Sequence, residues 1–226
     1  MLVGHFGVAL VAKRVEPKLS LGTSVLATML PDLLWCLFLI TGIEHVQFKP
    51  ALGAANYITD FDVVISHSLL MDAIWAAVFA TACFLKSHYP RGARVLFVVV
   101  LSHWFLDVVS LSEPIAPGSS IQVGFGLWYS VLATVLVEGG FWLLAVILYA
   151  RATHARKRIG IYAFWVVVVL LTLAWYNNIT GPPPPGAVTA GISSLIFFSL
   201  VVAWAYWMNR LRPVEGKSRD YQPRPG

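Results

Sequence analysis

Six stretches of this sequence are each long and apolar enough to cross a lipid bilayer, and this feature decides the class of fold. A transmembrane helix needs about 20 predominantly apolar residues. Only 12% of the residues are charged, whereas about a quarter of a typical soluble chain is charged. We therefore predict an all-α, polytopic transmembrane helical bundle with about six full spans. In chain order, the six stretches are residues 19–43, 61–85, 93–111, 127–150, 161–179 and 187–208.

The first twelve residues are also apolar, but they are too few for an ordinary span. Gly4 and Gly7 allow close contact between helices, so residues 1–12 are predicted to form a short half-helix buried against the other helices. Residues 1–208 are expected to form a single membrane-embedded domain. The remainder, 209–226, is basic and rich in proline, and we expect it to be a disordered tail.

The basic residues alternate between successive loops. The loops at 13–18, 86–91 and 151–158 and the C-terminal tail hold nearly all of the Lys and Arg residues, and the alternate loops hold one, Lys49. The positive-inside rule then places the tail in the cytoplasm and the loop after residue 43 outside. We expect a multi-pass protein of the inner (cytoplasmic) membrane, with membrane lipids as partners. No basic and aromatic cluster indicates a nucleic-acid partner, and the oligomeric state stays open.

Five ionisable side chains are expected at membrane depth. Such residues are costly in lipid and usually mark functional sites. At a rise of about 1.5 Å per residue, all five fall at compatible depths in the outer half of the bilayer. Pro31 is expected to break its helix near mid-span, and a broken helix is tolerated in lipid only where it is buried or lines a cavity. The five residues are His5, Asp32, His67, His103 and Asp107.

Imidazole and carboxylate groups form a ligand set that suits zinc, and also manganese or iron. Five ligands suffice for one closed site, or for two ions that share a carboxylate such as Asp107. We therefore predict one or two divalent transition-metal ions, with zinc favoured. A bound ion would also offset the cost of burying two carboxylates. Asp32 is the catalytic candidate, because it can alternate between metal ligand and general base.

Each of these residues also has a purely structural interpretation. A single intramembrane histidine commonly donates a hydrogen bond to a neighbouring helix, and Asp32 can cap the second half of a broken helix. Three further titratable residues are weaker candidates for the site. Glu138 and Asp72 have no partner at ligand spacing and fit interhelical hydrogen bonds better, and His45 lies in the polar loop at 44–60.

Four motifs follow one another along the chain: His5, Leu30-Pro31-Asp32, Ser66-His67-Ser68-Leu69-Leu70 and Ser102-His103-Trp104-Phe105-Leu106-Asp107. Their order resembles that of the YdjM-like family of inner-membrane metal-dependent hydrolases. The ligand order is also similar to that of the zinc phospholipase C and P1 nuclease family. That similarity implies one metal ion held by Asp32, His67, His103 and Asp107, with Asp107 as a bridge to a second ion held by His5.

The sequence departs from both families. Many YdjM-like proteins carry a His-Arg pair shortly before the Ser-His motif, and this chain has Asp62-Val63-Val64-Ile65 there. The phospholipase family has a further His, His and Glu after the last motif, and this chain does not supply them. One or two ions therefore fit better than three.

These features favour an integral-membrane, metal-dependent hydrolase that acts on a lipid-like phosphoester from an outward-facing intramembrane site. Other small-molecule substrates are not excluded by the sequence. Relays of His and Asp and broken helices are also typical of transporters. A proton-coupled permease that uses the same cluster therefore stays open, as does a membrane protein with a structural metal.

Overall fold

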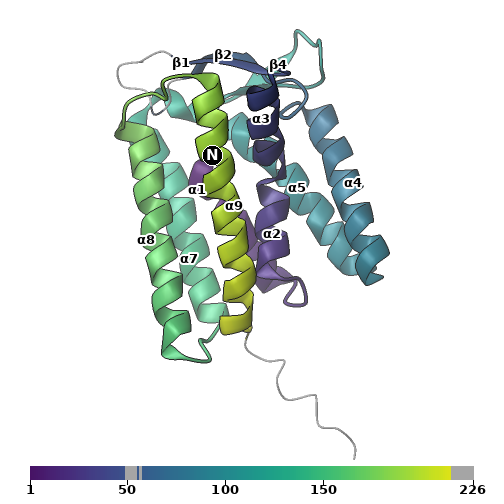
Figure 1. Cartoon of the computed structure of the whole chain (residues 1–226), viewed down its shortest axis with the longest axis vertical. Helices are drawn as coiled ribbons and strands as arrows, with labels where there is room; N and C mark the ends of the chain where they lie inside the picture. Colours follow the sequence, from purple (N-terminus) through teal and green to yellow (C-terminus); the bar gives the residue numbers. More distant parts are fainter. Residues whose placement is uncertain (49–54, 56–57, 215–226) are drawn as a thin grey trace, which may run out of the picture.

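The structure, a computed structural model, describes residues 1–48, 55 and 58–214. They form a bundle of helices with two short hairpins at one end (Figure 1). The predicted all-α fold is confirmed. The α-helices are α1 Leu2–Val15, α2 Leu21–Thr28, α3 Leu30–Thr41, α4 Leu69–Ser87, α5 Pro90–Ser110, α6 Val131–Thr134, α7 Gly140–Ala152, α8 Arg158–Thr180 and α9 Ala187–Leu211.

Short elements connect the helices at the end that we call the hairpin end. Strand β1 (His45–Phe48) pairs with β2 (Ile58–Asp62), and β3 (Ser112–Pro114) pairs with β4 (Gln122–Gly124), both in antiparallel register. A 3-10 turn, η1 (Leu127–Tyr129), precedes α6, and a π-helical segment, η2 (Val135–Gly139), joins α6 to α7. Sequence periodicity alone had indicated loops at 44–60 and 112–126, because strands of three to five residues leave little periodic signal.

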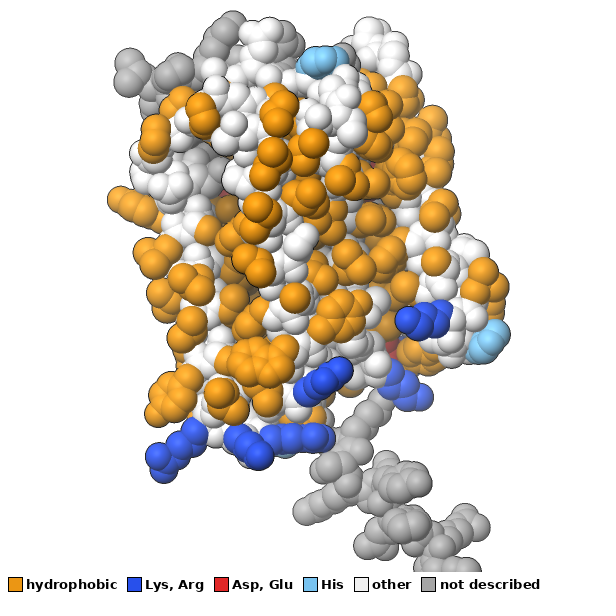
Figure 2. Space-filling model, in the orientation of Figure 1, with side chains coloured by type: hydrophobic (Ala, Val, Ile, Leu, Met, Phe, Trp, Pro, Cys, Tyr) orange, Lys and Arg blue, Asp and Glu red, His pale blue; other side chains and the backbone are white. Residues whose placement is uncertain are grey.

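The bundle has the dimensions of a multi-pass membrane protein. Within the described residues, α4, α5, the run Val131–Ala152, α8 and α9 are long and apolar enough to cross a membrane, and the bent pair α2–α3 makes a sixth candidate. Figure 2 shows apolar side chains along most of the visible face, with Lys and Arg gathered toward the end opposite the hairpins, which we call the basic end. The predicted number of spans is therefore confirmed.

Helix α1 is too short to be a full span and is buried among the other helices. Val3, Phe6 and Leu10 are at most 4% exposed. A Cβ added at Gly7 would lie 3.0 Å from the ring of Phe141 on α7, so the glycine allows the close approach of these two helices. The predicted half-helix is present, and it continues three residues beyond position 12, to Val15.

The break in the next span lies at Met29, between α2 and α3, where the axes bend by 52°. We had expected the break at Pro31. Proline is tolerated in the first turn of a helix, because the N–H groups there have no partner within the helix, so Pro31 begins the second helix. Asp32 follows it in the first turn of α3.

Helix α4 begins at Leu69, eight residues later than predicted. Residues 63–68 form turns instead, so His67 lies on a turn just before the helix. The buried carboxylate of Glu44 accepts hydrogen bonds from the backbone N–H groups of Ile65 and Ser66. These backbone donors are therefore satisfied without a helix.

The C-terminal part of the chain also differs in detail from the prediction. Helix α9 continues to Leu211, and Val214 forms an isolated β-bridge with Thr153. Residues 209–214 are therefore ordered against the basic end. The rest of the predicted tail, 215–226, lies outside the described residues.

Candidate metal centre

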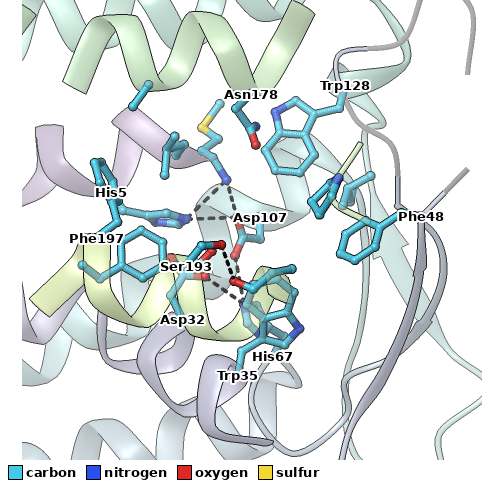
Figure 3. A pocket seen from close by; sticks show the side chains of 18 of the residues that line it. His5, Asp32, Trp35, Phe48, His67, Asp107, Trp128, Asn178, Ser193 and Phe197 are labelled. Carbon is cyan, nitrogen blue, oxygen red and sulfur yellow. Dashed lines mark hydrogen bonds and ion pairs between the residues drawn. The ribbon is translucent and has the colours of Figure 1, made fainter. Parts of the chain in front are cut away.

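All five predicted ligands meet in one cluster, although four separate segments carry them. Helix α1 supplies His5, α3 supplies Asp32, the turn before α4 supplies His67, and α5 supplies His103 and Asp107. Figure 3 labels all of these except His103. Two groups have ligand atoms that all lie within 4.8 Å of one another: His5, His103 and Asp107, and Asp32, His67 and His103. His103 belongs to both groups.

The carboxylate of Asp107 faces different partners with its two oxygens. Its Oδ1 lies 3.1 Å from His5 Nε2, and its Oδ2 lies 3.0 Å from His103 Nε2 and 3.9 Å from His67 Nε2. The imidazoles of His5 and His103 are stacked, with ring centroids 3.8 Å apart. The amino group of Met1 is 2.5 Å from Oδ1. The same amino group lies 3.3 Å from His5 Nε2, so an ion held by His5 and Asp107 Oδ1 would take the place of this amine.

Asp32 completes the second group. Its Oδ1 lies 3.5 Å from His67 Nε2 and 3.7 Å from His103 Nε2, and the two Nε2 atoms are 3.4 Å apart. Tetrahedral zinc with bonds of about 2.0–2.1 Å to N and O ligands places those ligand atoms about 3.4 Å from one another. The spacing of Asp32, His67 and His103 therefore fits a divalent metal ion without rearrangement of the backbone.

His103 is oriented by the break between α2 and α3. The carbonyl oxygen of Thr28, the last residue of α2, lies 2.7 Å from His103 Nδ1. A carbonyl can only accept a hydrogen bond, so Nδ1 carries the proton and Nε2 of the neutral ring presents its lone pair to the cluster. The helix break thus contributes to the site by placing Asp32 and by fixing the tautomer of His103.

His67 is oriented by a chain of hydrogen bonds through Ser66 to Glu44. Ser66 Oγ donates to Glu44 Oε2 over 2.6 Å and lies 2.7 Å from His67 Nδ1. Since the Ser66 hydroxyl proton points at the carboxylate, His67 Nδ1 must donate to Ser66, and its Nε2 is left free to bind a metal. Sequence reasoning missed Glu44, which is 1% exposed. Its place 22 residues before Ser66 gives no spacing signal.

Glu138 supports the helix that carries His5. It lies in the π-helical segment η2, and its carboxylate accepts hydrogen bonds from the backbone N–H of Gly4 (3.3 Å) and from the indole N–H of Trp128 (3.5 Å). Helix α1 has no side-chain cap of its own, so Glu138 satisfies one of its unpaired N–H groups from another helix. His5 is the next residue along α1. π-Helical segments are frequent at functional sites.

The two remaining candidates lie apart from the ligand groups. Asp72 on α4 is fully buried, and its Oδ2 accepts a hydrogen bond from the backbone N–H of Trp104 over 3.3 Å. Asp72 therefore contacts the backbone of the residue after His103 and belongs to neither ligand group. His45 lies on β1 with its side chain exposed, and it does not join either group.

A cavity of about 380 Å³ adjoins the cluster toward the hairpin end (Figure 3). His5, Asp32, His67 and Asp107 line it, and aromatic side chains and helices α8 and α9 complete its walls. Glu113 on β3 also lines the cavity and was missed by the sequence analysis. Burial, and secondly the charge of Asp107, raise the pKa of the Glu113 carboxyl to about 8.

No protein-family model, no curated protein and no solved structure matches this chain. The functional argument therefore depends on the geometry of the cluster and of the cavity beside it. In the described residues, the apolar bundle holds a His and Asp cluster that can bind a metal ion, at one wall of a cavity.

Proposed function

We propose that this protein is a membrane-embedded, metal-dependent hydrolase of a lipid-like phosphoester, of the kind found in the YdjM-like family that it resembles. The observation that carries the proposal is the convergence of three imidazoles and two carboxylates in one cluster, four members of which line a cavity. The contacts within the cluster join imidazole Nε2 atoms to carboxylate oxygens, and both kinds of atom can bind a metal ion. Ionisable side chains inside a bilayer are retained where they have a function.

The positions of the donor atoms support one assignment of the metal ligands. Asp32, His67 and His103 would hold one ion, and His5 with Asp107 would hold a second, with the Asp107 carboxylate shared between them. Nitrogen and oxygen donors of this mixture favour zinc and also accept manganese or iron. When bound, such an ion polarises a phosphoryl oxygen and lowers the pKa of a water molecule.

Asp32 is the group best placed to accept a proton from the attacking water. Its side chain is 17% exposed, whereas that of His103 is 1% exposed, and it lines the cavity. The Thr28 carbonyl and the Ser66 hydroxyl hold the two neighbouring imidazoles, so those rings act as fixed ligands. Asp32 is therefore both a ligand and the general base in this proposal.

The surroundings of the cavity support a lipid-like substrate. The site is enclosed by a bundle whose outer side chains are largely apolar, and the described residues that line the cavity include no Lys or Arg. The positive charge that a phosphate needs would then come from the metal ions. An acyl chain could remain among apolar side chains while the phosphoester reaches the cluster.

The basic end supports an orientation with the site in the outer half of the inner membrane. The Lys and Arg side chains visible in Figure 2 gather at the end opposite the hairpins, and the cavity is at the hairpin end. By the positive-inside rule, the basic end and the C-terminus are cytoplasmic. In a Cys83→Ser background, Ser120→Cys should react with an impermeant thiol reagent on intact cells, and His154→Cys should react only after permeabilisation. The reverse pattern would place the site on the cytoplasmic side.

The replacement of Asp32 by Asn tests the proposed enzyme. It keeps the size of the side chain and one acceptor oxygen, but it removes the charge and the basicity. Release of phosphate or head group from a panel of bilayer lipids should fall by about 10²-fold or more, the usual scale for a lost general base. Metal binding should weaken only in part, because His67 and His103 remain. The comparison is made at matched metal content.

The same experiment separates a hydrolase from a carrier. The 52° break between α2 and α3 is a feature that transporters share. If wild-type protein cleaves no lipid in the panel, yet moves a solute across vesicles in a manner that depends on Asp32, the hydrolase proposal is wrong and the permease takes its place.

A further inference from the structure

We propose that the cavity beside the metal centre binds an uncharged, hydroxyl-bearing head group, such as glycerol or a cyclic polyol, attached to the phosphate that is cleaved. This inference rests on the proposed function and names the substrate class of the same site. The residues that line the cavity apart from the predicted metal ligands support this head group.

One of these walls consists of neutral hydrogen-bonding groups from two helices. Asn177 and Asn178 lie near the end of α8, and Ser193 and Ser194 lie in the second turn of α9. Among the described residues, neither carboxamide has a side-chain hydrogen-bond partner. Figure 3 shows Asn178 reaching into the cavity near Trp128. An Asn side chain both donates and accepts hydrogen bonds, as a hydroxyl group does.

The serine hydroxyl on α9 presents the matching acceptor. Ser193 Oγ donates to the backbone carbonyl of Thr189 over 2.8 Å. Its lone pairs are therefore left for a donor in the cavity, and Figure 3 places its side chain near Asp32. The wall thus offers donors at the carboxamides and an acceptor at the hydroxyl. A ligand with several hydroxyl groups can satisfy both.

Aromatic side chains form a further wall. Phe48 and Trp128 lie on the same side of the cavity in Figure 3. The indole N–H of Trp128 is engaged by Glu138, which fixes the ring. Rigid aromatic surfaces combined with a few placed polar groups are typical of small-molecule pockets. The C–H edges of a polyol carry slight positive charge and suit the negative face of an aromatic ring.

Charge argues against an additional anionic group on the head. The described residues that line the cavity include three acidic side chains and no Lys or Arg. A second phosphate or a carboxylate on the head group would lie near these acids, and the cationic group among the described lining residues, the Met1 amine, is already paired with Asp107. The neutral wall on α8 and α9 offers no carboxylate for an ammonium group, and Glu113 on β3 is the one described lining acid outside the predicted ligands.

The experiment compares four lipids with identical acyl chains in mixed micelles of a nonionic detergent. They are phosphatidylglycerol, phosphatidylinositol, phosphatidylethanolamine and phosphatidic acid. For the zinc-loaded protein, kcat/KM should be about tenfold or more higher for the first two, the scale of one or two added hydrogen bonds. Asn178→Ala should reduce the ratio of phosphatidylglycerol to phosphatidic acid cleavage by about tenfold. Thr180→Ala, on the exposed face of the same helix end, should leave that ratio unchanged.

Binding of the same lipids, measured by native mass spectrometry, separates failure of the inference from failure of the proposed function. Cleavage with no preference, or with a preference for phosphatidylethanolamine, would overturn the inference and leave the hydrolase intact. If no lipid is cleaved but the hydroxyl-bearing lipids bind preferentially, the proposed head-group site is supported and the proposed hydrolase activity is wrong. Neither cleavage nor selective binding would overturn both.

Discussion

The two ends of the bundle both bury ionisable side chains, but they satisfy them in different ways. At the basic end, Lys13 is 5% exposed and donates to the backbone carbonyls of Pro17 and Leu19. Arg212 is 6% exposed, donates to the hydroxyl and the carbonyl of Thr153, and packs over the ring of Phe164. These cations therefore hold loops and helix ends together.

At the hairpin end, the five predicted ligands face one another, while Glu44 beside them binds backbone N–H groups. The atoms that approach within 3.0–3.9 Å are imidazole Nε2 atoms and carboxylate oxygens, and a cavity lies beside them. Backbone and neighbouring side chains occupy the opposite Nδ1 atoms of His67 and His103. The comparison shows that burial of charge does not by itself identify a site. What distinguishes the hairpin end is that potential ligand atoms converge beside a cavity.

The largest loss of zinc affinity is expected when the hydrogen bonds that run from Glu44 through Ser66 to His67 are broken. Ser66→Ala, and separately Glu44→Gln, should weaken zinc binding about 10–100-fold, because the Nδ1 partner that fixes the tautomer and orientation of His67 is lost or weakened. Competition with a chromogenic chelator measures the affinity.

The matched control comes from the basic end. Arg212→Gln removes a buried guanidinium that binds Thr153 and packs over Phe164, and we expect lower thermal stability with unchanged zinc affinity. If Arg212→Gln weakened zinc binding as much as Ser66→Ala did, the two ends would not differ in function, and the comparison would fail.

A smaller effect is expected at Glu138. The Ala variant removes an acceptor that caps α1, and loss of a cap typically costs about 1 kcal/mol. We therefore expect a lower melting temperature and about fivefold weaker binding at the ion position that depends on His5. Glu138→Gln keeps an acceptor oxygen and should restore most of both losses. Equal damage from the two variants would show that the charge, and not the cap, is what matters.

The sequence was sufficient for the spans and for the five clustered side chains, for a physical reason. Lipid excludes charge, so apolar runs define the helices, and the few ionisable residues within them must find partners. His5 and Asp107 are 102 residues apart, yet depth counting placed them in one layer and the structure places them 3.1 Å apart.

Other parts of the site depend on contacts that no local pattern encodes. Glu44 and Glu113 follow the ends of helices and look like ordinary loop acids until the fold buries them. Helix α4 begins later than predicted because Glu44 binds the backbone of residues 65 and 66. The helix break lies at Met29 and not at Pro31 because a proline can begin a helix. In each case, tertiary contacts or backbone sterics decided between local conformations that the sequence left close in energy.

The most direct test of the central claim is the metal content of the purified protein. Wild-type protein in mild detergent, loaded with zinc and freed of excess, should retain about one or two ions per chain by elemental analysis. His103→Ala should lose the ion that His103 holds with Asp32 and His67, so the metal content should fall by about one ion per chain. Circular dichroism checks that the variant is folded, and His103→Gln serves as a second variant of closer size. Folded wild-type protein that retains no metal would contradict the account.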